Sequence, residues 1–183
     1  MIPFPHFASE YKRRKILQKA RVLLMDDEKE FIDVLKERLE IAGYTVSACY
    51  DFDQALQAVQ TEAFDVALLD LVMPDTDGIT AMHRIKLIKP LLECIVLSGQ
   101  GTLRVAVEAM KQGAFEFLEK PCDIETVKQV IDQACARKHE HERRIDRAAK
   151  KVYERLEKAM VGATFAEAGQ FDTAKQVMQK NNV

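Results

Sequence analysis

Carboxylate side chains follow two short apolar runs of this sequence, and a lysine follows another. The run RVLLM leads into Asp26 and Asp27, the run VALLD ends on Asp70, and FEFLE is followed by Lys120. Three carboxylates brought together would repel one another, and a divalent cation such as Mg2+ would relieve that repulsion while keeping several of its waters. A carboxylate in such a site can attack a phosphoryl group and form an aspartyl phosphate, while the cation and the lysine neutralise the phosphoryl oxygens.

These residues meet only if the apolar runs are neighbouring strands of one sheet. Short apolar runs alternate five times with segments of helical periodicity, which is typical of an α/β protein with a doubly wound parallel sheet covered on both faces. Ligand sites of such sheets lie at the carboxyl ends of the strands. We expect strands at 21–25, 45–49, 66–70, 94–97 and 115–118, and helices from 26 to about 42, at 52–60, 79–88 and 103–110, and from 124 onward.

Local signals mark where the expected helices end and which side chains face the core. Gly43, Pro90 and Gly113 are well placed as helix stops, and Gly78 permits a turn after the third strand. In the first helix the expected inward face consists of Phe31, Val34, Leu35, Leu39 and Ala42.

Four sequence elements together resemble the receiver domain of two-component response regulators. They are VLLMDDE, LLDLVMPDTDG, VLSGQG and FEFLEKP, in that order, and the resemblance covers about residues 20–138. It implies a flavodoxin-like fold, with a doubly wound five-stranded parallel sheet of strand order 2-1-3-4-5. It also implies a response regulator of a two-component phosphorelay, which accepts a phosphoryl group from a sensor histidine kinase or a phosphotransfer protein and is not an enzyme in the usual sense.

The resemblance assigns each site residue of the family to one residue of this sequence. Asp70 resembles the phosphate acceptor, Asp27 the direct Mg2+ ligand, and Asp26 the neighbour that acts through a metal-bound water. The backbone carbonyl of Val72 would be a further ligand. Lys120 resembles the lysine that pairs with the phosphoryl group.

The resemblance also implies a switch. The Lys120–Pro121 bond would be cis, which would direct Lys120 into the site. Ser98 resembles the switch hydroxyl and Phe117 the switch aromatic, which moves into the space that Ser98 leaves. Because Phe117 lacks a hydroxyl, its switch would act by packing alone. Val72 and Gln100 occupy the two positions that tune the phosphate lifetime in the family.

Two other functions compete with the phosphorelay interpretation. An unphosphorylated pseudo-receiver could act as a constitutive interaction or dimerisation module, but the complete acidic set and Lys120 speak against it. A hydrolase of the haloacid-dehalogenase type would need a second Asp two residues after the nucleophile, where Val72 stands. The sequence also contains no GxxxxGK[ST] loop for nucleotide phosphates.

Composition limits the class of protein further. The 183 residues carry a formal net charge of -2, so no global field attracts nucleic acid. The four cysteines form no Cys-x-x-Cys pair, which argues against a zinc site or a disulfide scaffold and favours reduced thiols. The four histidines (6, 83, 139 and 141) are expected to be incidental. With no secretory signal and no apolar membrane span, we expect a cytoplasmic protein.

The chain is expected to divide into an N-terminal extension (1–19), the receiver (20–138) and a helical tail (139–183). The tail would consist of a prolonged last helix followed by a helical hairpin whose sequence resembles half of a tetratricopeptide repeat. Between Ile145 and Ala159, apolar residues recur at alternating spacings of four and three, which makes a homodimer possible. The tail lacks a basic recognition helix, so we expect a downstream protein target rather than DNA.

Overall fold

The computed structural model describes residues 19–73, 78–99 and 103–173. Its contacts divide the chain into one compact unit from Met1 to His139 and a second from Glu140 to Val183. In chain order the elements are β1 (Arg21–Met25), α2 (Lys29–Ile41), β2 (Thr45–Cys49), α3 (Phe52–Thr61), β3 (Val66–Asp70), α4 (Gly78–Ile88), β4 (Glu93–Ser98), α5 (Leu103–Lys111), β5 (Glu116–Glu119) and α6 (Ile124–Glu167).

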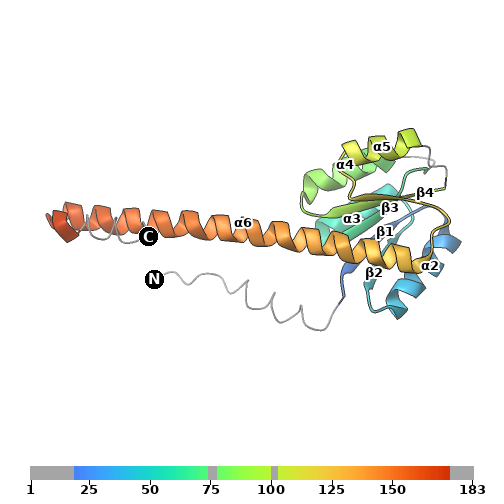
Figure 1. The fold of residues 1–183 in the computed structure, drawn as a ribbon, viewed down its shortest axis with the longest axis horizontal. Helices are drawn as coiled ribbons and strands as arrows, with labels where there is room; N and C mark the ends of the chain where they lie inside the picture. Colours follow the sequence, from blue (N-terminus) through green and yellow to red (C-terminus); the bar gives the residue numbers. More distant parts are fainter. Residues whose placement is uncertain (1–18, 74–77, 100–102, 174–183) are drawn as a thin grey trace. The chain divides into compact units, whose positions relative to one another are not determined.

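The strands form one five-stranded sheet in the order β2-β1-β3-β4-β5, and every neighbouring pair is parallel (Figure 1). The predicted fold class and strand order are therefore confirmed. β3 lies at the centre of the sheet, and all five of its residues are buried. Strands covered on both faces read as continuous apolar runs rather than as alternating ones, which is why the sequence locates them well.

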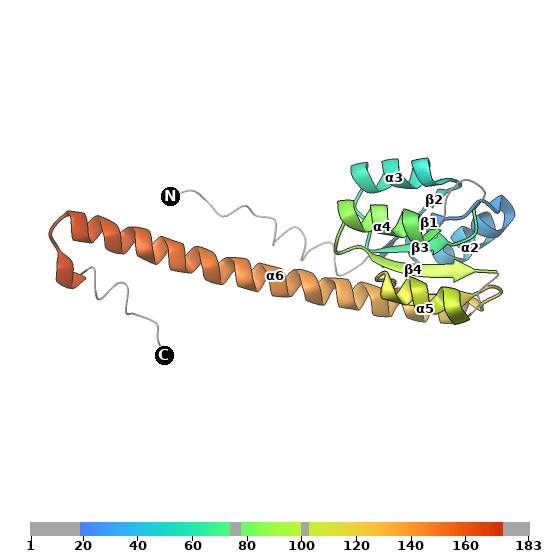
Figure 2. The same cartoon turned by 90° about the horizontal axis from the view of Figure 1, so that it is seen from above.

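Two apolar clusters fill the space on the two faces of the sheet. One face packs against α3, α4 and α5, which contribute buried residues such as Ala55, Met82 and Ala109. The other face packs against α2 and α6, with Leu39 and Ile131 among its buried residues. Figure 2 shows α3 and α4 on the side of the sheet opposite α6.

The inward face of α2 differs from the prediction. Ile32, Leu35 and Leu39 are the buried residues of this helix, whereas Val34 is 50% exposed. A helix turns by roughly 100° per residue, so Val34 lies about 130° from the centre of the stripe made by the three buried residues. The prediction included Val34 because it is apolar, but helical geometry turns it toward solvent.

Helix α6 fastens to the sheet through apolar and ionic contacts. Val127, Val130, Ile131 and Ala134 are buried at helical spacing. Near the end of this stripe, Arg137 pairs with the carboxylate of Glu93, which is only 3% exposed and begins β4. The Nε of Arg137 lies 2.8 Å from Glu93 Oε1. A buried carboxylate needs such a partner because removal from water penalises its charge.

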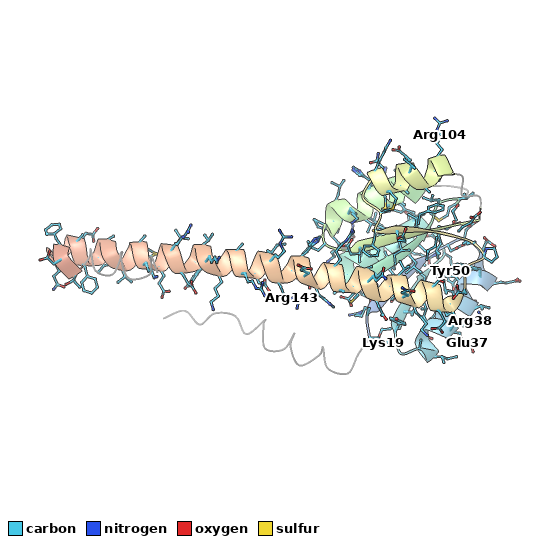
Figure 3. The ribbon with its side chains drawn as sticks, viewed as in Figure 1. Lys19, Glu37, Arg38, Tyr50, Arg104 and Arg143 are labelled. Atoms are coloured by element: carbon cyan, nitrogen blue, oxygen red, sulfur yellow. The ribbon has the colours of Figure 1, made fainter. Side chains whose placement is uncertain are left out.

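In the second unit, α6 continues to Glu167 and is mostly exposed. Figure 3 draws side chains such as Arg143 projecting from the helix into solvent. The helix ends at a turn in which Gly169 has a positive φ of 76°, a conformation that favours glycine. A C-terminal helical extension is thus present, but most of the predicted second helix of the hairpin lies outside the described residues.

No helix within the described ranges is long and apolar enough to cross a bilayer.

Gly78 begins α4 where the helix touches the end of β3. A Cβ added at this position would lie 2.4 Å from the carbonyl oxygen of Asp70 and 2.5 Å from the Cα of Leu71. The Gly78 amide also donates a hydrogen bond to the Leu71 carbonyl. The sequence predicted a glycine that permits a turn, but in the structure this glycine is required by close contact between two backbones.

We expect Gly78→Ala to lower the free energy of unfolding by about 1–3 kcal/mol, because the methyl group would push the start of α4 away from β3. Chemical denaturation measures the change. Gly99→Ala is the matched control, since a Cβ there meets nothing within 4 Å. Equal effects of the two substitutions would contradict the close-contact explanation.

The ion pair between Arg137 of α6 and the buried Glu93 of β4 should appear in a double-mutant cycle. We expect Glu93→Gln and Arg137→Met to show a coupling energy above about 1 kcal/mol in urea unfolding, because Arg137→Met leaves the buried Glu93 carboxylate with Lys86, 3.7 Å away, in place of its closest charged partner. The exposed pair Arg21–Glu62 is the control, and Glu62→Gln with Arg21→Met should couple by less than about 1 kcal/mol. Additive effects at Glu93 and Arg137 would show that the pair does not stabilise the attachment of α6.

Candidate functional site

The register of the parallel strands brings the predicted site residues to one edge of the sheet. Met25 pairs with Leu69, so Asp26, the next residue after β1, comes level with Asp70 at the end of β3. Asp70 pairs with Leu97, and Ser98 therefore follows at the end of β4. These residues come from segments more than 20 positions apart, and the fold alone makes them neighbours.

Carboxylate oxygens of Asp26, Asp27 and Asp70 lie within 4.8 Å of one another. Asp26 and Asp70 are each 3% exposed, whereas Asp27 is exposed to solvent. The amide of Leu71 donates to Asp70 Oδ1 at 2.8 Å, and the amide of Glu28 donates to Asp26 Oδ1 at 3.0 Å. The Asp26 side chain therefore orients the chain just before α2, although Glu28 is the N-cap residue of this helix.

Lys120 lies across from the carboxylates. Its Nζ is 2.6 Å from Asp26 Oδ2 and 3.7 Å from Asp70 Oδ2, and its side chain is 10% exposed. A backbone hydrogen bond fixes its position, since the Lys120 amide donates to the carbonyl of Ser98 at 2.9 Å. The Lys120–Pro121 peptide bond is cis.

The pKa values of Asp70 and Lys120 reflect two opposing effects, which are the burial of each group and the charges beside it. Burial raises the pKa of Asp70 and the nearby Asp26 raises it further, against the lowering effect of Lys120. Burial alone would lower the pKa of Lys120, but Asp26, Asp70 and Glu28 raise it above its ordinary value. The lysine therefore keeps its positive charge, and the acidic group retains an excess of negative charge that one ammonium does not neutralise.

The site has the donors and the access that a hard divalent cation needs. Three carboxylates offer oxygen ligands, and the exposed Asp27 leaves one side open to the waters that Mg2+ keeps. The residues present therefore fit a Mg2+ ion, which would neutralise the charge that Lys120 leaves uncompensated.

The remaining predicted residues surround this group. Ser98 is buried at 1% exposure, and Phe117 is partly buried against the apolar cluster beneath α3, α4 and α5. Val72 follows β3 with a half-exposed side chain, and its carbonyl stays a predicted ligand. Gln100 lies outside the described residues.

Two further contacts of Lys120 were not predicted. Glu28 Oε1 lies 3.3 Å from the ammonium, and the ring of Phe31 lies beneath it with 4.3 Å between Nζ and the ring centroid. Both residues stand in or just before α2, 92 and 89 positions before Lys120. The acidic sequence DDE contains Glu28, so its charge was visible, but no sequence signal identified Phe31 as a neighbour of the lysine.

Comparisons with known proteins agree with this fold. The family model of the response regulator receiver domain matches residues 22–132. The chain is 31% identical over 118 residues to the transcriptional regulatory protein ZraR of Escherichia coli, which covers 64% of this chain and 27% of ZraR. It is 36% identical over 115 residues to the DNA-binding transcriptional regulator NtrC of Azospirillum brasilense, covering 63% of this chain and 24% of NtrC.

These matches span about a quarter of each regulator's length. Among solved structures, a response regulator receiver domain protein from Clostridium thermocellum superposes with a TM-score of 0.63 at 34% identity, over 66% of this chain and 98% of that one. The family match covers more than half of the chain, and its range contains the acidic group and Lys120. The chain therefore belongs to the response regulator receiver domain family.

Proposed function

We propose that this protein is a phosphorylation-controlled response regulator, in which Asp70 accepts a phosphoryl group in the presence of Mg2+. The observation that supports the proposal most directly is the meeting of Asp26, Asp27, Asp70 and Lys120 at one sheet edge. The family supports a sensor histidine kinase or a phosphotransfer protein as the donor and the cytoplasm as the location.

The chain's own residues prepare Asp70 for attack. The Leu71 amide holds Oδ1, while Oδ2 faces Lys120. As an oxygen of Asp70 bonds to phosphorus, the phosphorus–nitrogen bond of a phosphohistidine donor breaks, and its electron pair stays on the leaving imidazole, which takes up a proton. Asp26, Asp27, Asp70 and the Val72 carbonyl would hold Mg2+, which would supply the charge neutralisation that phosphoryl transfer needs.

The response would be a population shift read at the surface of α5, β5 and α6. In this proposal the Ser98 hydroxyl moves toward the phosphoryl oxygens, and the Phe117 ring packs into the space vacated. Phe117 is suited to this movement because it is partly buried beside the cluster that also contains Val96. A downstream protein then binds the altered surface.

Asp70→Asn should abolish phosphorylation, because an amide oxygen does not replace a carboxylate as nucleophile. Intact mass spectrometry after incubation with Mg2+ and acetyl phosphate would show one added phosphoryl group on the wild type only, and chelation of Mg2+ should prevent it. Asp53→Asn, an exposed acid of α3, is the control and should be phosphorylated like the wild type. Absence of phosphorylation on the wild type would instead favour the constitutive pseudo-receiver.

We further propose that the exposed face of α6 in the second unit mediates homodimerisation. Ile145, Val152 and Leu156 are 53%, 56% and 58% exposed and, with Ala149 and Ala159, keep the spacing of a coiled-coil seam. A second copy presents the same stripe, so the two faces are complementary by symmetry. The supporting observation is this regular apolar exposure along a helix with i,i+4 charge pairs such as Lys150 and Glu154.

Leu156→Lys should weaken the dimer, because a charge at the seam would be desolvated opposite its symmetry mate. Sedimentation equilibrium over a range of protein concentrations would then show a dissociation constant at least about tenfold higher than that of the wild type. Ile41→Lys is the matched control, since Ile41 is 79% exposed on α2 and lies outside the seam. A monomeric wild type at all concentrations, with and without phosphorylation, would refute the dimer.

A further inference from the structure

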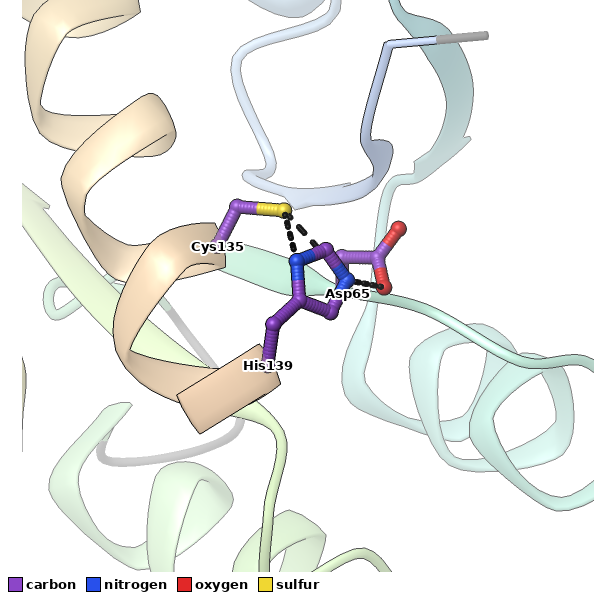
Figure 4. A group of neighbouring side chains, drawn as sticks. All are labelled: Asp65, Cys135 and His139. Carbon is purple, nitrogen blue, oxygen red and sulfur yellow. Dashed lines mark hydrogen bonds and ion pairs between the residues drawn. The ribbon is translucent and has the colours of Figure 1, made fainter. Parts of the chain in front are cut away.

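A second group of metal-ligating side chains lies at the opposite edge of the sheet from Asp70. Asp65, Cys135 and His139 each place one ligand atom within 4.8 Å of the other two (Figure 4). Asp65 directly precedes β3 and Asp70 ends it, so the strand separates the two groups by about 16 Å. All three residues belong to the first unit.

Two of the three ligands share one face of α6. Cys135 and His139 are four positions apart, which places their side chains one above the other on a helix. The Cys135 Sγ lies 3.6 Å from His139 Nδ1 and 3.8 Å from Nε2, and Nε2 lies 3.7 Å from Asp65 Oδ1. Figure 4 shows the imidazole between the sulfur and the carboxylate. The side chains of His139 and Asp65 are 17% and 20% exposed, so an ion can reach them from solvent.

The backbone of Arg21 holds the Asp65 carboxylate in place. The Arg21 amide donates to Asp65 Oδ2 at 2.9 Å, and the Arg21 carbonyl accepts from the Asp65 amide at 2.8 Å. These bonds leave Oδ1 facing α6. Burial raises the pKa of Asp65, but the Arg21 amide and Lys138 lower it more, and the carboxylate is ionised. Such outer hydrogen bonds orient carboxylate ligands in metal sites.

The two separations from His139 Nε2 are close to those of a tetrahedral zinc site, and the Cys135 sulfur and an Asp65 oxygen lie within 4.8 Å of each other. Bonds of about 2.3 Å to sulfur and about 2.0–2.2 Å to nitrogen and oxygen place neighbouring ligand atoms about 3.4–3.6 Å apart. The two distances from Nε2 need to contract by about 0.2–0.3 Å, which side-chain rotation can supply. A thiolate, an imidazole and a carboxylate together suit a borderline divalent ion better than Mg2+, which prefers oxygen alone.

We propose that Asp65, Cys135 and His139 bind a divalent transition-metal ion of the zinc class, with water in the fourth position. Binding releases the thiol proton of Cys135 to solvent and ties α6 to the segment that precedes β3. The expectation against zinc was based on the lack of a Cys-x-x-Cys pair, but this site takes its ligands from three different residue types.

Lys138 sets the affinity of this site. Its Nζ lies 2.9 Å from Asp65 Oδ1, the oxygen that the metal needs. The ammonium and the ion therefore compete for one carboxylate oxygen. Removal of the lysine charge should consequently strengthen metal binding, an effect opposite in sign to the removal of a ligand.

Cys135 is distinguished from the other thiols by its surroundings. Burial raises the pKa of Cys49 to about 11 and that of Cys94 to about 12, so neither thiol readily becomes a ligand. Cys122 is partly buried, as Cys135 is, but it does not lie in the group with Asp65 and His139. Cys122 therefore provides a matched control.

The test uses the reduced, metal-stripped full chain, with excess Mg2+ to occupy the acidic site, and Co2+ as a spectroscopic substitute for zinc. We expect one Co2+ per chain with a thiolate-to-cobalt charge-transfer band. Cys135→Ser should abolish the band, and His139→Ala should weaken Co2+ and Zn2+ affinity by more than about tenfold in competition with a chromophoric chelator. Lys138→Gln should tighten binding.

Cys122→Ser and His141→Ala are the controls and should bind like the wild type, with circular dichroism checking that every variant is folded. Asp70→Asn should also retain the band, which separates this site from the phosphorylation site. The proposal is overturned if the wild type shows no thiolate band, if Cys135→Ser keeps it, or if Lys138→Gln weakens binding. Rapid alkylation of Cys135 without a cobalt band would identify an activated thiol instead of a metal site.

Discussion

The contact of the Lys120 ammonium with two buried carboxylates is the interaction on which the acidic site depends. Asp26 and Asp70 are almost inaccessible to water, and two uncompensated charges at that depth would oppose folding. Lys120 neutralises part of this charge without closing the site, because Asp27 stays exposed. The contact therefore offsets part of the cost of burying the two acids, and negative charge remains that a cation would neutralise.

The geometry of this contact is set by the backbone rather than by the side chains. The pairing of β1 with β3 brings Asp26 level with Asp70, and a backbone hydrogen bond from Lys120 to Ser98 fixes the lysine beside them. Gly78 lets α4 begin against the backbone of β3, directly behind Asp70. The position of Asp70 therefore depends on three strands and on the start of one helix.

The sequence allowed most of this arrangement to be predicted because its signals are local. Buried parallel strands appear as apolar runs, and the chemistry lies where each run ends. The errors and omissions come from contacts between distant segments. Phe31 was expected to pack inward in α2, yet its ring also lies under Lys120, and Asp65, Cys135 and His139 were not connected because 70 positions separate the carboxylate from the thiol. Helical periodicity likewise fails to distinguish Ile32 from Val34 without knowledge of where the stripe is centred.

Helix α6 begins near the carboxyl ends of the strands and farther along contacts residues at their amino ends. It begins four residues after Lys120, and its buried stripe packs on the face that also contains residues of β1 and β3. Farther along, Arg137 and Lys138 pair with Glu93 and Asp65 at the starts of β4 and β3. A rigid helix that is attached at both ends of the same strands can transmit a conformational change from one end to the other only if one of its attachments has two alternative arrangements. The ionic attachment would have that property if the proposed metal binds, because Asp65 Oδ1 would then face an ion shared with His139 in place of the ammonium of Lys138.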